Sequence, residues 1–139
     1  MTTVTITEDI AGPAAHVWAI LGDFAGIEVG GPVTAVDLEG EGVGMVRTIS
    51  LGEGRVVERL DVHDDAAMRF AYSIINDDCA LPVSDYSASV QVTDLGSGGC
   101  RVEWSGTFVP KGAPEAEVIP VVEGIYRGGI AGARQAVEG

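Results

Sequence analysis

The chain has 139 residues, of which eight are basic and 21 acidic, giving a formal net charge of −13 and a pI near 4.2. This excess of acid argues against a nucleic-acid partner, which needs Lys and Arg to neutralise phosphates, and disfavours docking on anionic membranes. No apolar run approaches the roughly 20 residues that cross a bilayer, and the amino terminus lacks the basic and apolar regions of a secretion signal. We therefore expect one cytoplasmic domain over residues 1–139, without membrane insertion, whose surplus apolar side chains line an interior.

The first part of the chain predicts two strands separated by short helical segments. Val4 and Ile6 alternate with threonines, as in a half-buried strand. Gly12-Pro13 then opens a short helix, because the missing N–H of proline is tolerated in a first helical turn. The expected segments are a strand over 3–8, a short helix over 14–21, a second short helical turn over 22–26 and a strand over 33–39.

A β-hairpin is predicted next, from two alternating segments over 43–51 and 55–62. Gly52-Glu53 between them fits a two-residue type II′ turn, in which the glycine takes the positive φ. That turn places Arg47 opposite Glu58 on a face that is otherwise apolar or glycine. The other pairs on this face are Leu51 with Gly54, Ile49 with Val56, Met45 with Leu60 and Val43 with Val62. Two opposite charges on the inner side indicate either a polar anchor inside a cavity or a buried ion pair that fixes the strand register.

The second half of the chain predicts three further strands and a long helix. The strand segments alternate apolar with polar residues, and the helix has apolar residues at three- and four-residue steps. The strands are expected over 68–75, 86–93 and 100–109, and the helix over 114–137, interrupted near its start by Pro120. Small residues inside this helix serve either to open space for a ligand or to pack closely on the sheet; they are Gly124, Gly128, Gly129 and Gly132.

This order of elements predicts an α+β fold, in which a curved antiparallel sheet of about six to seven strands wraps around the long C-terminal helix. The helix is the obvious cover for the apolar face of the sheet, and a strongly curved sheet can leave a hollow beneath it. The side chains expected to line this hollow are Met45, Arg47, Ile49, Glu58, Leu60, Phe70, Tyr72, Ile74, Tyr86, Val90, Trp104 and Phe108 from the sheet and Tyr126 from the helix.

The sequence offers little for metal, redox or nucleotide chemistry. Cys79 and Cys100 are expected to be unpaired thiols in a reducing compartment. His16 falls on the first helix and His63 at a strand end, so a metal site shared by the two histidines is not expected. No glycine-rich phosphate loop or nucleophile elbow occurs. We therefore expect neither a metal nor a cofactor.

A set of short motifs resembles a known family in order and spacing. The motifs are Ala11-Gly-Pro-Ala-Ala-His-Val-Trp18 with Asp23-Phe24, Gly42-Val-Gly-Met-Val-Arg47, Glu58-Arg-Leu60, Asp64-Asp65, Tyr72-Ser-Ile74, Leu81-Pro-Val83 with Tyr86, and Val102-Glu-Trp-Ser105 with Phe108. Over nearly the whole chain they resemble the polyketide cyclase/dehydrase branch of the SRPBCC superfamily, whose helix-grip fold is shared with START lipid-transfer domains and the birch pollen allergen.

The resemblance implies a cavity between the sheet and the long helix that takes apolar or amphipathic small molecules. The segment Gly26 to Pro32 departs from the family pattern, because it lacks the aromatic residue that usually walls the mouth of the pocket.

The leading functional hypothesis is the binding of a small hydrophobic or aromatic ligand that carries one polar group. The first alternative is an enzyme of cyclase, dehydratase or isomerase type in the same cavity, with Arg47 as donor to a carbonyl oxygen and Glu58 as general acid or base. The second alternative is an interaction or structural module with a collapsed cavity. The expected partner is a small apolar or amphipathic molecule, and the chain is expected to be a monomer or a homodimer.

Overall fold

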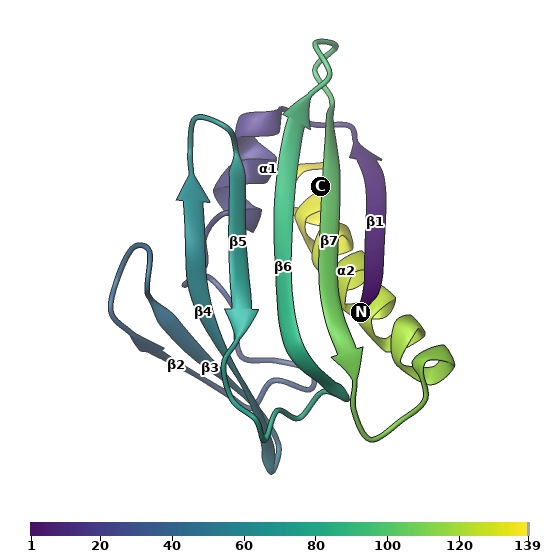
Figure 1. The fold of residues 1–139 in the computed structure, drawn as a ribbon. Helices are drawn as coiled ribbons and strands as arrows, with labels where there is room; N and C mark the ends of the chain where they lie inside the picture. Colours follow the sequence, from purple (N-terminus) through teal and green to yellow (C-terminus); the bar gives the residue numbers. More distant parts are fainter. Residues whose placement is uncertain (139) are drawn as a thin grey trace.

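The computed structural model describes residues 1–138, which form a seven-stranded antiparallel sheet and two helices (Figure 1). The strands are β1 (Thr2–Ile10), β2 (Ala35–Glu39), β3 (Val46–Leu51), β4 (Gly54–Asp64), β5 (Arg69–Ile74), β6 (Val83–Asp94) and β7 (Cys100–Pro110), and the helices are α1 (Ala14–Leu21) and α2 (Glu115–Glu138). The sheet order is β1-β7-β6-β5-β4-β3-β2, so β1 and β2 are its edges. The predicted helix-grip architecture is confirmed.

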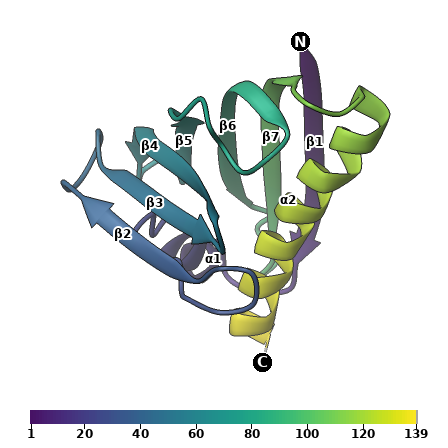
Figure 2. The ribbon, with the colours of Figure 1, turned by 90° about the horizontal axis from the view of Figure 1, so that it is seen from below.

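Helix α2 covers the concave side of the sheet. Figure 2 shows it beside β1 and β7, while β2, β3 and β4 curve away from it on the opposite side. Its fully buried residues follow the predicted helical period; they are Val118, Val122, Tyr126, Ile130 and Ala133. Glu115 and Glu117 lie in its first turn, where acidic side chains are favourable beside the positive end of the helix dipole. No helix within residues 1–138 is both long enough and apolar enough to cross a bilayer.

The β3–β4 hairpin has the predicted register around its charged pair. Arg47 is paired with Glu58, and the turn begins at Gly52, whose φ of +69° suits a type II′ turn. The neighbouring pairs Ile49 with Val56 and Leu51 with Gly54 also occur as predicted. The turn length therefore fixed which residues share the inner face.

The far end of this hairpin differs from the prediction. The amide of Gly44 donates to the Leu60 carbonyl and the amide of Leu60 donates to the Met45 carbonyl, so two residues of one strand face one of the other. This bulge ends the regular pairing, and β3 begins only at Val46. Val43 consequently lies exposed instead of pairing with Val62.

Two predicted helical features are also corrected. Residues 22–26 form a turn and not a second short helix, with the amide of Gly26 donating to the Asp23 carbonyl. Pro120 does not interrupt α2, which continues from Glu115 to Glu138. A proline in the second turn removes one helical hydrogen bond, and the buried face of the helix compensates for it.

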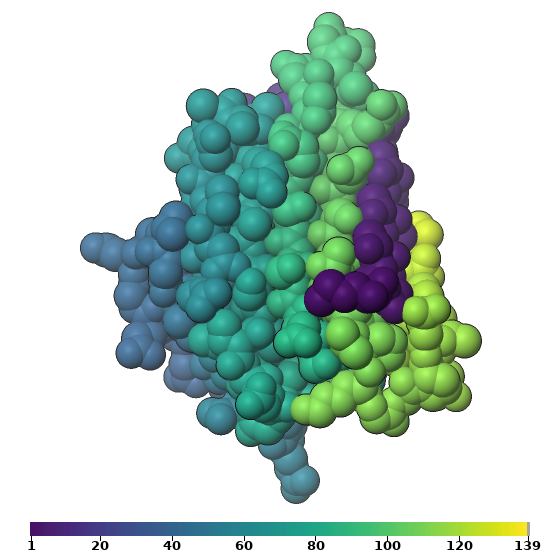
Figure 3. Space-filling model, in the orientation of Figure 1, coloured from purple at the N-terminus to yellow at the C-terminus, as the bar shows by residue number. Residues whose placement is uncertain are grey.

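Figure 3 shows the outer face of the sheet, where the exposed positions of β1 and β7 are mainly polar. On β1 the exposed side chains are Thr3, Thr5 and Thr7, which alternate with buried apolar residues. On β7 the outward positions include Arg101 and Glu103. The sheet therefore presents only its inner face to the core.

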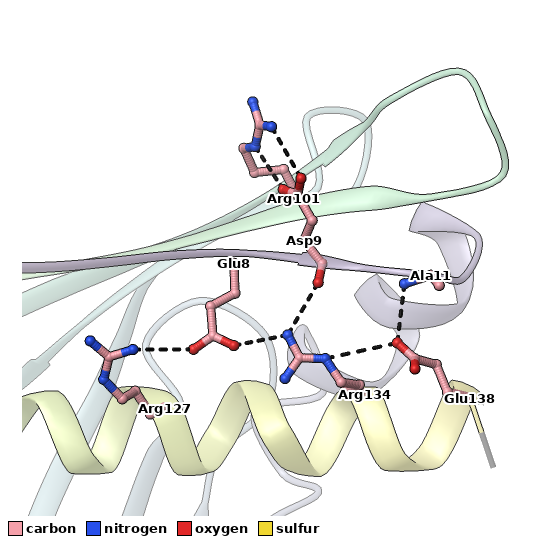
Figure 4. Close-up of polar contacts among 7 residues, drawn as sticks. All are labelled: Glu8, Asp9, Ala11, Arg101, Arg127, Arg134 and Glu138. Carbon is pink, nitrogen blue, oxygen red and sulfur yellow. Dashed lines mark hydrogen bonds and ion pairs between the residues drawn. The ribbon is translucent and has the colours of Figure 1, made fainter.

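The C-terminal half of α2 is held against β1 by a set of ion pairs that we call the β1–α2 clamp: Glu8, Arg127, Arg134 and Glu138 (Figure 4). Arg134 Nη2 donates to Glu8 Oε1 at 2.8 Å and to the Asp9 carbonyl at 3.1 Å. Arg127 Nη1 lies 3.6 Å from Glu8 Oε2. The side chain of Asp9 points to the other face of β1 and accepts from Arg101.

Candidate functional site

A cleft of about 300 Å³ opens between α2 and the inner face of the sheet. Its walls come from α1 and the turn after it, from four strands, and from the middle of α2. The lining residues are Ile20, Leu21, Asp23, Gly26, Ile27, Arg47, Ile49, Glu58, Phe70, Tyr72, Trp104, Ile125 and Gly129. Apolar and aromatic side chains dominate, and the charged residues are the Arg47–Glu58 ion pair and Asp23, which is the usual composition of a small-molecule site.

Arg47 on β3 and Glu58 on β4 form the charged pair of this cleft. Arg47 Nε donates to Glu58 Oε1 at 2.7 Å, and both side chains are nine-tenths buried. Arg47 Nη1 donates to the Phe24 carbonyl at 2.8 Å, and the guanidinium carbon lies 3.8 Å from the centroid of the Phe24 ring. The turn after α1 therefore holds the guanidinium through a hydrogen bond and a cation–π contact.

Each member of the pair keeps one polar atom free. Among residues 1–138, Arg47 Nη2 and Glu58 Oε2 have no hydrogen-bond partner, and no fully buried side-chain nitrogen or oxygen lacks one. Both free atoms are therefore accessible, and the cleft is the space that these two residues line. A donor and an acceptor thus stand side by side at an apolar wall.

Near the pair, the hydroxyls of three tyrosines and the indole of Trp104 form a chain of hydrogen bonds. Trp104 Nε1 donates to the Tyr72 hydroxyl at 3.2 Å, and the Tyr72 and Tyr86 hydroxyls are 3.1 Å apart. The Tyr86 and Tyr126 hydroxyls are 2.5 Å apart. The chain thus joins β7, β5, β6 and α2, and it includes every tyrosine of the protein.

Burial keeps these phenols neutral. Desolvation raises the pKa of Tyr72 and of Tyr86, and the neighbouring Glu58 charge raises the pKa of Tyr72 further. Desolvation also raises the pKa of Tyr126, to about 12. The chain therefore consists of hydroxyl groups that both donate and accept, with no phenolate at neutral pH.

The predicted lining residues divide into three groups. The cleft is lined by Arg47, Ile49, Glu58, Phe70, Tyr72 and Trp104. Met45 and Leu60 line a second hollow of about 310 Å³ beside Phe24 and His63, and Ile74 and Tyr86 line a small one of about 90 Å³ at the ends of β5 and β6. Val90, Phe108 and Tyr126 are fully buried in the core.

From the family resemblance, sequence reasoning placed residues 26–32 at the mouth of the pocket, but it did not identify which residues after α1 line the cleft. Gly26 and Ile27 line the cleft mouth, where the family pattern has an aromatic residue that this chain lacks. Ile125 on α2 was noted only as part of an apolar helix face, yet it lies at the rim, half exposed. The loss of regular periodicity after Leu21 carried no signal for these positions.

The helix glycines also divide. A Cβ on Gly129 would lie 2.5 Å from Trp104 Cζ3, so close packing explains this glycine. The other three, Gly124, Gly128 and Gly132, face open space. Since the Trp104 ring also stacks on Tyr126 with centroids 5.0 Å apart, Gly129 fixes the position of the indole at the cleft.

The remaining candidates for chemistry do not converge on the cleft. Within residues 1–138 no group of three or more His, Cys, Asp or Glu side chains is placed to hold a metal ion. Cys79 and Cys100, both inside the described part of the chain, are free thiols. His63 shares a hydrogen bond of 2.9 Å with the Gly22 carbonyl, which ties β4 to the end of α1.

Fold and cleft together define a helix-grip protein with an internal space of ligand size. The chain belongs to the family described as polyketide cyclase / dehydrase and lipid transport, whose family model matches residues 1–138. No curated protein matches the chain.

Solved structures share the fold over almost the full length. The protein XoxI from Bacillus cereus is 31% identical, with a TM-score of 0.85, and the match covers 99% of this chain and 96% of that one. A protein from Bacillus thuringiensis is 30% identical, with a TM-score of 0.82 and coverage of 97% and 98%. Norcoclaurine synthase from Thalictrum flavum, solved with dopamine and hydroxybenzaldehyde, is 17% identical, with a TM-score of 0.71 and coverage of 96% and 83%, and is similar in fold alone.

Proposed function

We propose that the protein binds a small hydrophobic or aromatic molecule in the cleft and holds one polar group of that molecule at Arg47 and Glu58. One observation carries the proposal: a nine-tenths buried ion pair at an apolar wall leaves Arg47 Nη2 and Glu58 Oε2 free. A hydroxyl group, which accepts and donates at once, matches this pair of atoms. Family membership supports a ligand-binding role in general.

The size and walls of the cleft set the kind of ligand. A volume of about 300 Å³ is at the lower end of small-molecule sites. Phe70, Tyr72 and Trp104 offer aromatic faces, which favour offset or edge-on contact with a ring. A molecule of two fused rings with one hydroxyl fits these requirements. The third possibility, a module with a collapsed cavity, leaves this open space without an explanation.

An enzymatic use of the same cleft is the second candidate. The observation that favours it is again the free Oε2 of Glu58 beside the free Nη2 of Arg47. The carboxylate would take a proton from the carbon next to a ketone, and the guanidinium would stabilise the enolate oxygen until the proton returns. Methyl-group exchange of acetylnaphthalene in heavy water tests this use, since Glu58→Gln must abolish any exchange above the solvent rate.

Probe binding tests the proposed function. Naphthol and methylnaphthalene have similar size, and only naphthol carries a hydroxyl. We expect the protein to bind naphthol about ten-fold more tightly by fluorescence titration, because a hydrogen bond to a charged group is worth roughly 1.5–3 kcal/mol. In Arg47→Met/Glu58→Leu, which replaces both charges by apolar groups, the preference for naphthol must disappear.

A matched control lies on the outer face of the same hairpin. Arg59 Nε donates to Asp61 Oδ1 at 2.7 Å, the same length as the buried pair, in a solvent-exposed setting. Arg59→Met/Asp61→Leu must leave the preference for naphthol intact. Failure of both probes to bind, together with native mass spectra that never show a bound small molecule, would overturn the proposal.

We also propose a cytoplasmic location. The free thiols of Cys79 and Cys100 support it, because a reducing compartment keeps cysteines unpaired.

A further inference from the structure

The tyrosine chain beneath the cleft contains one more hydrogen than it can use. Trp104, Tyr72, Tyr86 and Tyr126 contribute four N–H and O–H hydrogens, and three contacts link the four groups. One hydrogen serves each contact, so one hydroxyl hydrogen is left without an acceptor. Within residues 1–138 these three hydroxyls have no other hydrogen-bond partner.

The direction of the chain decides where the surplus hydrogen lies. The indole can only donate, so the Tyr72 oxygen always accepts from Trp104. If Tyr72 donates to Tyr86 and Tyr86 to Tyr126, the surplus falls on Tyr126. If both hydroxyls rotate, Tyr126 donates to Tyr86 and Tyr86 to Tyr72, and the surplus moves to Tyr72. If Tyr86 accepts from both neighbours, its own hydrogen remains.

The three positions differ in what can receive the hydrogen. Tyr126 is fully buried, and its hydroxyl faces Gly106 so closely that a Cβ there would overlap it. Tyr86 is buried between the other two phenols and also lines the small hollow of about 90 Å³. Tyr72 lines the cleft of about 300 Å³, next to Arg47 and Glu58. Of the three hydrogens, only that of Tyr72 belongs to a residue at the cleft.

We infer that Tyr72 donates a hydrogen bond to an oxygen of the bound ligand, and that the ligand therefore carries a carbonyl or ether oxygen in addition to the group held by Arg47 and Glu58. When a ligand occupies the cleft, Tyr126 donates to Tyr86 and Tyr86 donates to Tyr72. The surplus hydrogen then lies on Tyr72, and the ligand oxygen accepts it. Because an unpaired buried hydroxyl is unfavourable, this step strengthens binding. Tyr86 and Tyr126 act as positioning residues that set the direction of donation. The inference rests on the proposed function, since it requires a ligand in the same cleft.

The experiment compares acetylnaphthalene with ethylnaphthalene, which have the same ring system and differ in the carbonyl oxygen. For the wild-type protein we expect acetylnaphthalene to bind about ten-fold more tightly. Tyr72→Phe keeps the ring and removes the hydroxyl, so it must bring the two dissociation constants together. The infrared carbonyl stretch of bound acetylnaphthalene must also move to higher frequency in this variant, which a loss of structure alone would not produce.

Tyr86→Phe tests the positioning role of Tyr86. It removes one hydroxyl of the same kind and leaves the Tyr72 hydrogen free for the ligand at all times. The preference for acetylnaphthalene must therefore persist or increase, even though the protein is less stable because the Tyr126 hydroxyl loses its partner.

The outcomes separate this inference from the proposed function. If both probes bind the wild-type protein equally, or if the preference disappears in Arg47→Met/Glu58→Leu and persists in Tyr72→Phe, the Tyr72 inference is wrong and the ligand cleft stands. If naphthol binds and neither of these two probes does, the Tyr72 inference is wrong and the ligand cleft stands; if naphthol and methylnaphthalene also fail to bind, the proposed function fails and this inference fails with it.

Discussion

The buried Arg47–Glu58 pair and the β1–α2 clamp use the same chemistry in opposite surroundings. In the clamp, Glu8 lies within reach of both Arg127 and Arg134, and water reaches all three side chains. In the cleft, Arg47 and Glu58 are nine-tenths buried, with each as the other's only ion-pair partner among residues 1–138. We therefore expect the clamp to tolerate the loss of one charge, and the buried pair not to tolerate it. Burial, and not the number of contacts, decides how strongly the fold depends on each pair.

The largest expected effect comes from breaking the buried pair on one side. Arg47→Met or Glu58→Leu alone should lower the free energy of unfolding by about 3–5 kcal/mol, because each leaves an unpaired buried charge. The double variant Arg47→Met/Glu58→Leu should lie close to the wild-type protein or above it. Urea denaturation measures all three. Single and double variants of equal stability would show that the pair is not desolvated as the structure indicates.

Effects of intermediate size are expected at two adjacent glycines of α2. Gly129 lies on the cleft side of the helix and Gly128 on its solvent side. Gly129→Ala should destabilise by roughly 1–3 kcal/mol, because its Cβ overlaps the Trp104 ring. Gly128→Ala should stabilise by about 0.5–1 kcal/mol, because its Cβ meets open space and alanine restricts the unfolded chain. Thermal unfolding followed by circular dichroism measures both. The same sign for the two variants would contradict the close packing at Trp104.

The smallest effect is expected in the clamp. Glu8→Gln removes the shared partner of Arg127 and Arg134 and should lower the free energy of unfolding by at most about 1 kcal/mol. The difference should nearly vanish at about 1 M salt, where the screening length is about 3 Å. Urea denaturation at low and high salt checks this. If the loss of stability persists at high salt, the prediction is wrong, and Glu8 is shielded from solvent ions as Glu58 is.

The sequence predicted the fold where local rules act. The two-residue turn at Gly52 set Arg47 opposite Glu58, and the helical period identified the buried face of α2. The prediction failed at Val43, because a bulge at Gly44 and Met45, opposite Leu60, breaks the strict alternation that the pairing assumed. The position of a bulge depends on how β3 packs within the whole sheet, and a short sequence pattern does not indicate that packing.

The site was predictable in its charges and not in its geometry. Arg47 and Glu58 were identified because charges on an apolar face violate the pattern. The hydrogen bond from Arg47 to the Phe24 carbonyl joins a strand to an irregular turn, so no periodicity could indicate it. The tyrosine chain likewise needs β5 and β6 to bring the Tyr72 and Tyr86 hydroxyls to 3.1 Å, and α2 to bring the Tyr126 hydroxyl to 2.5 Å from that of Tyr86.

Trp104 gives the cleft an optical signal of its own. The protein has two tryptophans, and Trp18, on α1, is not among the residues that line the cleft: its Nε1 donates to Asp65 and its ring is 5.1 Å from that of His63. Indole emission depends on the polarity around the ring, so filling the cleft changes the emission of Trp104, the tryptophan that lines it. Trp18→Phe would therefore leave a protein whose intrinsic fluorescence reports occupancy of the cleft without any added dye.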